Sequence, residues 1–325
     1  MKKILIVGGG GYIGTSLTNK LLKSNIVKIY DEFNFDWILK NHKQLKNNNR
    51  LFFIKKKLNE VSLGDFKEID IVCDVCGISN DPSGELNSKF TWDVNYKGRI
   101  KFASMAKKAG VKHYIFNSTC AVYGHNKRIV SEKSKKNPIS TYAKANLKAE
   151  EKIYSMRNKN FTVNVLRNAT LYGSSHTMRL DLVINKFVYD FMKTKKITIH
   201  GDGQQWRPFV SIADICNIYF ELINKKRKSF ICNAVSFNLK INELAKLVSF
   251  LLKGKKNSII YKANNFDLRN YKVSNTKFLK EFENFKFSDL KKEIIKLKSH
   301  FNKYKTKENE KTIRMLYYKK KLSLK

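Results

Sequence analysis

The segment that decides the fold reads ILIVGGGGYIG over residues 4–14. Its four apolar residues are typical of a buried strand, and a helical pattern follows the glycines to about residue 23. Gly8, Gly11 and Gly14 have the spacing of the fingerprint that joins a strand to a helix around a dinucleotide pyrophosphate. The first N–H groups of that helix would face the phosphates. The segment therefore predicts a dinucleotide site near the N-terminus.

The next apolar run, residues 27–30, ends in an acid, Asp31, which follows Gly14 by 17 residues. At this place in the fingerprint, a carboxylate accepts hydrogen bonds from the adenosine ribose and repels a 2′-phosphate. No arginine follows Asp31 directly. The sequence therefore predicts NAD rather than NADP.

Further strand-like runs alternate with helical patterns along the chain. The strands are expected at 51–54, 69–73, 114–116 and 162–166, and the helices at 92–109 and 142–154. Such alternation predicts an α/β fold with a doubly wound, parallel sheet of the Rossmann type.

The alternation becomes less regular after Gly173. We expect a dinucleotide-binding domain over residues 1–175 and a smaller, mainly substrate-binding part over 176–290, some of whose segments return to the first domain. Residues 291–325 are expected to form a basic tail, because lysine dominates there and the apolar periodicity weakens. We predict that this tail is a helix fraying into disorder, so that deletion from about Lys296 leaves folding and cofactor binding intact.

The 325 residues include 65 Lys and Arg against 27 Asp and Glu, which gives a net charge of +38. Only 10 of the basic residues are arginine, and the lysines are spread through every segment. Nucleic-acid recognition favours arginine, so the charge is better explained by the codon preference of an AT-rich genome than by a nucleic-acid surface.

The apolar runs are too short to cross a membrane, and the N-terminus becomes rich in glycine too early for a secretion signal. Five scattered cysteines do not form a disulfide framework. Cys73 and Cys76 have metal-ligand spacing, but no second Cys or His pair accompanies them, so they are interpreted as packing thiols and no metal is expected. We expect a soluble, cytoplasmic protein.

Several later segments carry a family resemblance. They read VNYKG (94–98), NSTCAVYG (117–124), PISTYAKANLKAE (138–150), LRNATLYG (166–173) and GDGQQWRPFV (201–210). Their order resembles that of the extended short-chain dehydrogenase/reductases, specifically the NAD-dependent epimerase/dehydratase family that acts on nucleotide sugars. The resemblance runs from Lys2 to about Ile295.

This resemblance implies roles for individual residues. Tyr142 would be the base that takes a proton from a sugar hydroxyl, and Thr119 would orient the substrate. NAD would be contacted by Tyr12, Ile13, Cys76, Asn95, Ser118, Tyr142 and Asn146, together with Gly8, Gly11, Gly14 and Asp31. A nucleotide-diphosphate sugar would be contacted by Thr119, Thr170, Arg179, Asn185, Arg207 and Arg269. Members of the family often form dimers, so a homodimer is possible.

The catalytic motif departs from the family at Asn146, where the family has a lysine that lowers the pKa of the tyrosine by its charge. Lys144 and Lys148 point to other faces of the helix. Asp74 likewise replaces a histidine. If the protein is an enzyme, Asn146→Lys should raise activity and move the pH optimum toward neutrality.

The residues after Thr119 are Cys120 and Ala121, where sugar dehydratases and decarboxylases carry acids. The resemblance therefore favours epimerisation or simple sugar oxidation and reduction, in surface-polysaccharide synthesis. Two alternatives stay open. One is a weakened or inactive relative that binds NAD or a nucleotide sugar, and the other is a nucleic-acid-binding protein on the same fold.

Overall fold

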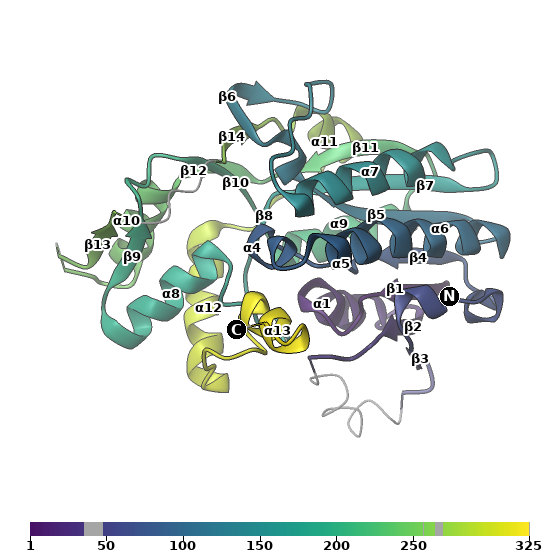
Figure 1. Ribbon diagram of the computed structural model, residues 1–325, viewed down its shortest axis with the longest axis horizontal. Coiled ribbons are helices and arrows are strands. Elements are labelled where there is room, and N and C mark those ends of the chain that lie inside the picture. Colours follow the sequence, from purple (N-terminus) through teal and green to yellow (C-terminus); the bar gives the residue numbers. More distant parts are fainter. Residues whose placement is uncertain (36–47, 256, 264–268, 325) are drawn as a thin grey trace.

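A seven-stranded sheet forms the centre of the computed structural model, which describes residues 1–35, 48–255, 257–263 and 269–324 (Figure 1). All neighbouring strands of this sheet are parallel, in the order β11-β7-β5-β4-β1-β2-β3. The predicted doubly wound α/β fold is confirmed. The strands are β1 (Lys3–Val7), β2 (Ile26–Asp31), β3 (Leu51–Lys55), β4 (Ile71–Asp74), β5 (His113–Thr119), β7 (Thr162–Asn168) and β11 (Phe230–Ala234).

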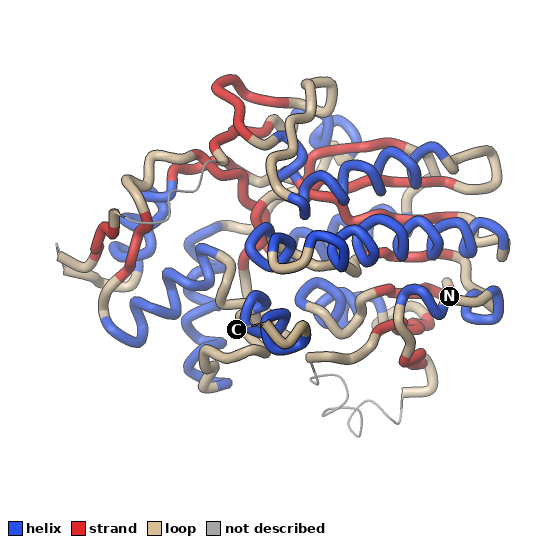
Figure 2. The backbone as a smooth tube through the Cα atoms, viewed as in Figure 1, coloured by secondary structure: helices blue, strands red, loops and turns tan. Residues whose placement is uncertain are grey.

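Helices cover both faces of this sheet, as Figure 2 shows. On one face, Ile4 and Ile6 of β1 pack in the same core cluster as Leu17 of α1. On the other face, Leu5 and Val7 share a cluster with residues of α6 and α7. Successive side chains of a strand point to opposite faces, which is why a strand buried on both sides reads as a continuous apolar run.

The helices in chain order are α1 (Tyr12–Leu21), η1 (Leu58–Glu60), η2 (Leu63–Phe66), α4 (Asp81–Glu85), α5 (Ser88–Trp92), η3 (Asp93–Gly98), α6 (Arg99–Lys108), η4 (Cys120–Tyr123), α7 (Thr141–Ser155), α8 (Val183–Thr194), α9 (Ile212–Asn224), α10 (Ile241–Leu251), α11 (Thr276–Glu281), α12 (Leu290–Tyr304) and α13 (Arg314–Lys321).

The remaining strands form three small sheets that lie mostly after residue 170. They are ordered β12-β10-β8, β13-β9 and β14-β6. Because β11 returns to the edge of the central sheet beside β7, the later half of the chain contributes to both parts of the molecule. These strands are β6 (His125–Val130), β8 (Thr170–Tyr172), β9 (Ile197–His200), β10 (Trp206–Ser211), β12 (Phe237–Lys240), β13 (Ile259–Lys262) and β14 (Asn270–Val273).

The predicted fraying of the C-terminal tail is wrong for the residues that the structure describes. Helix α12 buries Ile294, Leu297 and Phe301 in the main core cluster, and it packs against α8 (Figure 1). Helix α13 contacts α4 and buries Arg314. The tail therefore docks through apolar and buried polar contacts despite its many lysines.

The sheet changes direction of growth between β1 and β4. The chain moves outward from β1 to β2 and β3, and then returns to place β4 and β5 on the other side of β1. Ligands in open α/β sheets bind outside the carboxyl ends of the strands at such a point. The fold thus places a site where β1 and β4 end.

Candidate active site

A cavity of about 520 Å³ lies at the carboxyl ends of the central strands. Its walls include residues that follow β1, β4 and β5, and others from the small sheets and the C-terminal segment. The lining that comes from the N-terminal half consists of Gly11, Tyr12, Ile13, Phe35, residues 75–82, Arg99, residues 117–119, Ala121, Tyr142 and Asn146.

The glycine loop, residues 8–14, forms the turn that its spacing predicts. Gly8 has φ of +80°, in the region that favours glycine, and its carbonyl oxygen accepts a hydrogen bond from the N–H of Gly11 at 3.0 Å. A Cβ at Gly14 would lie 2.2 Å from the carbonyl oxygen of Gly8, so only glycine lets the helix begin so close to the strand. The loop is a cradle that any larger residue would fill, which fits a pyrophosphate.

Asp31 lies at the end of β2 and closes the glycine loop from the side. Its carboxylate accepts hydrogen bonds from the N–H groups of Gly10 at 2.9 Å and Phe33 at 2.6 Å. Burial raises the pKa of Asp31 above its ordinary value, and these two hydrogen bonds oppose the rise. The geometry fits the predicted ribose contact, which stays a prediction.

Tyr142 and Thr119 are brought together in the cavity from different elements. Tyr142 is on the first turn of α7 and Thr119 ends β5, and both side chains line the cavity. Burial raises the pKa of Tyr142 above its ordinary value, whereas the Thr119 hydrogen bond and the charges of Arg179 and Arg99 lower it. A phenol beside a hydroxyl, both reachable from a cavity, is what a proton transfer to or from a sugar oxygen requires.

Asn146 is buried one turn after Tyr142, and both of its amide atoms are engaged. Its Nδ2 donates to the backbone oxygen of Tyr142 at 2.8 Å, and its Oδ1 accepts from Nη1 of Arg99 at 2.9 Å. Sequence reasoning missed Arg99, which is 1% exposed and lines the cavity. Its one visible signal was that arginine is rare in this chain.

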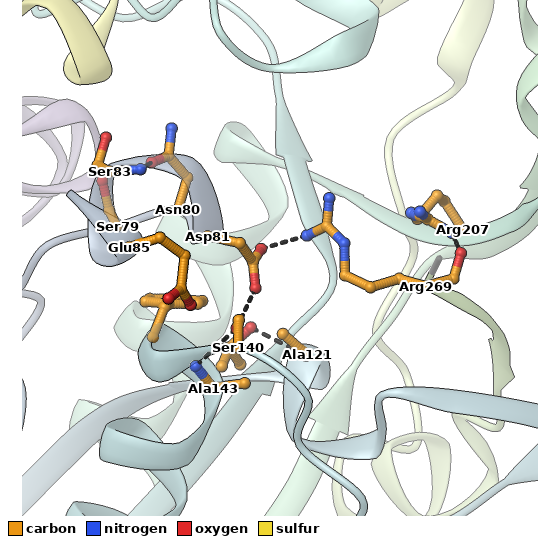
Figure 3. Close-up of polar contacts among 12 residues, drawn as sticks. Ser79, Asn80, Asp81, Ser83, Glu85, Ala121, Ser140, Ala143, Arg207 and Arg269 are labelled. Carbon is orange, nitrogen blue, oxygen red and sulfur yellow. Dashed lines mark hydrogen bonds and ion pairs between the residues drawn. The ribbon is translucent and has the colours of Figure 1, made fainter. Parts of the chain in front are cut away.

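Three predicted arginines line the cavity, Arg179 on the side of Tyr12 and Arg207 beside Arg269. Arg207 donates to the backbone oxygen of Arg269, and Arg269 forms an ion pair with Asp81 at the start of α4 (Figure 3). Arg179 is held by Asp181 through two contacts of 2.9 Å each. Fixed guanidinium groups suit a diphosphate.

Asp81 and Asp181 were not predicted from the sequence. Asp81 also accepts a hydrogen bond from Ser140, the N-cap of α7, and thus joins the arginine end of the cavity to the helix of Tyr142 (Figure 3). Nothing in the spacing marked Asp81, because Ser140 and Arg269 lie far away along the chain, whereas Asp181 lies only two residues from its partner Arg179.

Some predicted contact residues support the cavity from behind. The side chain of Asn95 bonds both the N–H and the carbonyl oxygen of Ile78 in the loop after β4. Asn185 donates to the hydroxyl of Tyr12 and to the backbone oxygen of Arg179. Neither asparagine is part of the lining that the structure describes, whereas Cys76, Ser118 and Thr170 are. The Ser118 hydroxyl, however, donates to Glu150.

The C-terminal segment supplies a wall that sequence reasoning missed entirely. Ile313, Arg314, Met315 and Tyr318 line the cavity. The Arg314 guanidinium stacks on Phe35, 3.7 Å from the ring centroid, and its buried Nη2 has no hydrogen-bond partner among the described residues. Burial lowers the pKa of Arg314 to about 10.

The cysteines carry no sign of reactivity. Burial raises the pKa of Cys73, Cys76 and Cys120 well above the ordinary value. Among the described residues, no three His, Cys, Asp or Glu side chains gather as metal ligands. None of the helices in the described ranges has the length and hydropathy that a bilayer crossing requires.

Comparison with known proteins adds to this geometry. The model of the NAD dependent epimerase/dehydratase family matches residues 4–234, which include the glycine loop, Thr119, Tyr142 and Arg207. The chain belongs to this family. The predicted family is therefore confirmed, and NAD is the cofactor of that family.

Individual relatives of the chain differ in their reactions. YtcB of Bacillus subtilis, described as an uncharacterized UDP-glucose epimerase, is 29% identical over 221 residues, which cover 65% of this chain and 69% of that protein. The dTDP-D-glucose 4,6-dehydratase of Homo sapiens is 27% identical over 263 residues, covering 78% and 74%. Epimerases and dehydratases are thus matched to similar extents.

Solved structures agree in fold. A UDP-glucuronic acid 4-epimerase from Bacillus cereus, in complex with UDP-glucuronic acid and NAD, has a TM-score of 0.81 at 22% identity, covering 93% of this chain and 99% of the other. A dTDP-glucose 4,6-dehydratase from Streptomyces venezuelae, with NAD bound, has the same TM-score at 19% identity, covering 93% and 98%.

Proposed function

We propose that this protein is an NAD-dependent nucleotide-sugar epimerase, or a closely related sugar oxidoreductase, with Tyr142 as its base. The observation that carries the proposal is that Tyr142 and Thr119 line one cavity together with the glycine loop, Arg207 and Arg269, and that Thr119 lowers the pKa of Tyr142. A dinucleotide and a diphosphate sugar need the glycine loop and the arginines.

Each residue of the cavity has one part in this proposed reaction. The glycine loop holds a pyrophosphate at the start of α1, and Asp31 accepts hydrogen bonds from a ribose. A bound NAD would supply the acceptor for a hydride from a carbon of the sugar. Tyr142 removes the proton from the oxygen on that carbon and returns it when the carbonyl is reduced again, and Thr119 orients this oxygen.

Epimerisation is favoured over dehydration by the residues beside Thr119. The Cys120 thiol is buried, donates to the backbone oxygen of Arg167, and has a pKa raised by burial; Ala121 has no acid group. Elimination of water from the sugar needs its own acid and base, and neither neighbour supplies one. The sugar is assigned only as a nucleotide-diphosphate sugar, and we place the reaction in surface-polysaccharide synthesis.

A panel of nucleotide sugars, screened by thermal stabilisation and then by product analysis with NAD present, tests this function. We expect conversion of at least one sugar, and loss of conversion in Tyr142→Phe with NAD binding retained. Tyr154→Phe, on the same helix, is the matched control and should convert the sugar normally. Full activity of Tyr142→Phe would refute the assignment of the base.

A second candidate is a relative that binds NAD or a nucleotide sugar without converting it. The observation that favours it is Asn146, which brings no charge to Tyr142. Stabilisation by a sugar without product formation, over a broad pH range, would support this candidate against the first.

A further inference from the structure

Arg99 is a buried cation to which the proposed reaction assigns no role. It is the first residue of α6, and it lies inside the molecule with a side-chain exposure of 2%. Its Nε is 3.0 Å and 3.2 Å from the two carboxylate oxygens of Asp74, at the end of β4. A buried guanidinium is costly unless it is paired and hydrogen-bonded, and Asp74 supplies that partner.

The carboxylate of Asp74 is itself fixed by two further hydrogen bonds. It accepts hydrogen bonds from the hydroxyl of Tyr114 at 2.9 Å and from the N–H of Cys76 at 3.2 Å. This explains why an acid stands where the family has histidine: Asp74 is the counter-ion of Arg99.

The other end of the guanidinium faces α7 and the cavity. Nη1 donates to Oδ1 of Asn146 at 2.9 Å, and Nη2 donates to the backbone oxygen of Asn117 at 2.9 Å. The guanidinium carbon lies 3.8 Å from the centroid of the Phe116 ring, which holds its plane. Arg99 therefore holds its charge against Asn146, the residue that stands where the family motif has a lysine.

Asn146 is complementary to this arrangement in a way that lysine is not. An amide oxygen accepts a hydrogen bond from a guanidinium, whereas an ammonium group has no acceptor. A lysine at residue 146 would bring a second positive charge against Arg99. The changes at 74, 99 and 146 thus fit together as one set.

We propose that Arg99, held by Asp74 and Asn146, supplies the positive charge that Tyr142 needs as a base, in place of a lysine on α7. The proposal rests on the proposed function. Arg99 acts through Asn146 and through space, so it is a positioning residue and not a catalytic one.

Two other charged groups, Asp81 and Arg179, also act on the pKa of Tyr142. The Asp81 carboxylate, on α4, raises the pKa of Tyr142, and the charges of Arg179 and, to a smaller extent, of Arg99 lower it. Arg179 donates to both oxygens of Asp181 and to the Ser79 hydroxyl, and no hydrogen bond among the described residues joins it to a side chain of α7. Of Arg99 and Arg179, within the described residues, Arg99 alone is hydrogen-bonded to a side chain of α7, that of Asn146.

The test removes the charge without leaving a buried ion unpaired. In Asp74→Asn/Arg99→Gln, both charges are lost and polar groups of similar shape remain. A phenol that loses a nearby cation has a higher pKa, so we expect the alkaline-rising limb of the kcat profile to move up by about one pH unit, with turnover near neutral pH falling about tenfold. NAD affinity, measured by calorimetry, should change less.

The matched control is Glu150→Gln/Arg167→Gln, which removes an equally buried ion pair with side-chain exposures of 2% and 2%. It should lower thermal stability by a similar amount and leave the pH limb in place. If the Asp74→Asn/Arg99→Gln protein does not fold, Arg99→Lys is the second variant, because it keeps the positive charge and loses the planar guanidinium. The rising limb of its kcat–pH profile should stay within a few tenths of a pH unit of that of the natural protein.

Asn146→Lys, made alone and in the variant that lacks Arg99, gives the sharpest test. The proposal reverses the expectation from the sequence that this substitution raises activity. Asn146→Lys alone should now lower stability and fail to raise activity, because the ammonium meets Arg99. In the Asp74→Asn/Arg99→Gln background, the same substitution should return the limb toward its natural position. A native chain made faster by Asn146→Lys, or a limb unmoved by loss of Arg99, would overturn the proposal.

Titration of Tyr142 separates this proposal from the proposed function. Isotope-labelled tyrosine, with Tyr142→Phe to assign the signal, reports the ionisation of Tyr142 by NMR without any turnover. If no sugar is converted but the Tyr142 pKa still rises on loss of Arg99, the proposed function fails and the charge role stands. If sugars are converted and the Tyr142 pKa does not move, the charge role fails alone.

Discussion

The glycine loop, residues 8–14, and helix α13, Arg314–Lys321, border the same cavity but depend on very different lengths of chain. The loop is made by neighbouring residues: Gly11 bonds Gly8, and Gly14 packs on the same turn. The other wall brings Ile313 to Tyr318 against elements some 130 to 300 residues earlier, through contacts such as Thr312 to Leu180 and Lys321 to Glu32. One wall of the cavity is thus built by a short sequence motif, and the other is built by a segment that packs against residues far away along the chain.

The largest effect should come from removing the docked segment as a whole. A chain that ends at residue 289 loses Ile294, Leu297 and Phe301 from the core, each of which contributes about 1.5–3 kcal/mol. That sum approaches the whole stability of an ordinary domain, so we expect loss of the cooperative melt by circular dichroism. Leu297→Ala should cost about 2–5 kcal/mol by the same measurement. A stable, cofactor-binding chain ending at 289 would restore the view of a dispensable tail.

The next effect concerns the local wall. Gly14→Ala places a Cβ 2.2 Å from the carbonyl oxygen of Gly8, so the loop must open and the phosphate cradle is lost. We expect calorimetry to show NAD affinity at least about tenfold weaker, or about 1.4 kcal/mol. Gly64→Ala is the matched control, because nothing lies within 4 Å of the added Cβ. Unchanged NAD binding in Gly14→Ala would remove the loop from the cofactor site.

A smaller truncation sharpens the comparison between the two walls. A chain that ends at residue 308 keeps α12 and loses α13, and with it Arg314, whose buried guanidinium faces the cavity. We expect it to fold and to bind NAD about five- to tenfold more weakly, roughly 1 kcal/mol. A chain ending at Lys321 serves as control and should bind like the full chain. Equal NAD affinities of the chains ending at 308 and 321 would show that α13 covers the cavity without contributing to NAD binding.

The smallest effect is a change of preference. Asp31→Asn removes the charge that would repel a 2′-phosphate and keeps one of the two hydrogen bonds from Gly10 and Phe33, because the amide has a single acceptor oxygen. The ratio of NADP to NAD dissociation constants, measured by titration with each, should fall by roughly tenfold. Glu32→Gln, the neighbouring acid, should leave the ratio unchanged. Tighter binding of NADP than NAD by the natural chain would show that Asp31 does not face the ribose.

Much of the fold was predictable because its signals are local. Every central strand up to β7 was predicted within a few residues of its observed bounds, since strands buried on both faces read as apolar runs. Helix α12 carried a signal too: Leu290, Ile294, Leu297 and Phe301 recur at helical spacing. The lysines between them hid this stripe, because long charged side chains can cover apolar surface while their heads stay in water.

The site divides in the same way. Glycine spacing, the hydroxyls of Thr119 and Tyr142 and the rare arginines could be found from the sequence, because backbone geometry and side-chain chemistry are properties of short segments. The ion pair of Arg99 with Asp74 could not, although Asp74 was recognisable as an odd residue in its strand. An ion pair between residues 25 positions apart depends on how β4 and α6 are stacked, and spacing carries no record of that.

The sequence by itself determined the family, the sheet and the cofactor end, because turn, strand and helix preferences act over a few residues at a time. The tertiary structure decided which charges meet: it set Arg99 against Asn146, Asp81 against Arg269, and the C-terminal helix against the cavity. The physical reason is that a buried charge is tolerated only beside its partner, and the partner is chosen by packing in three dimensions rather than by distance along the chain.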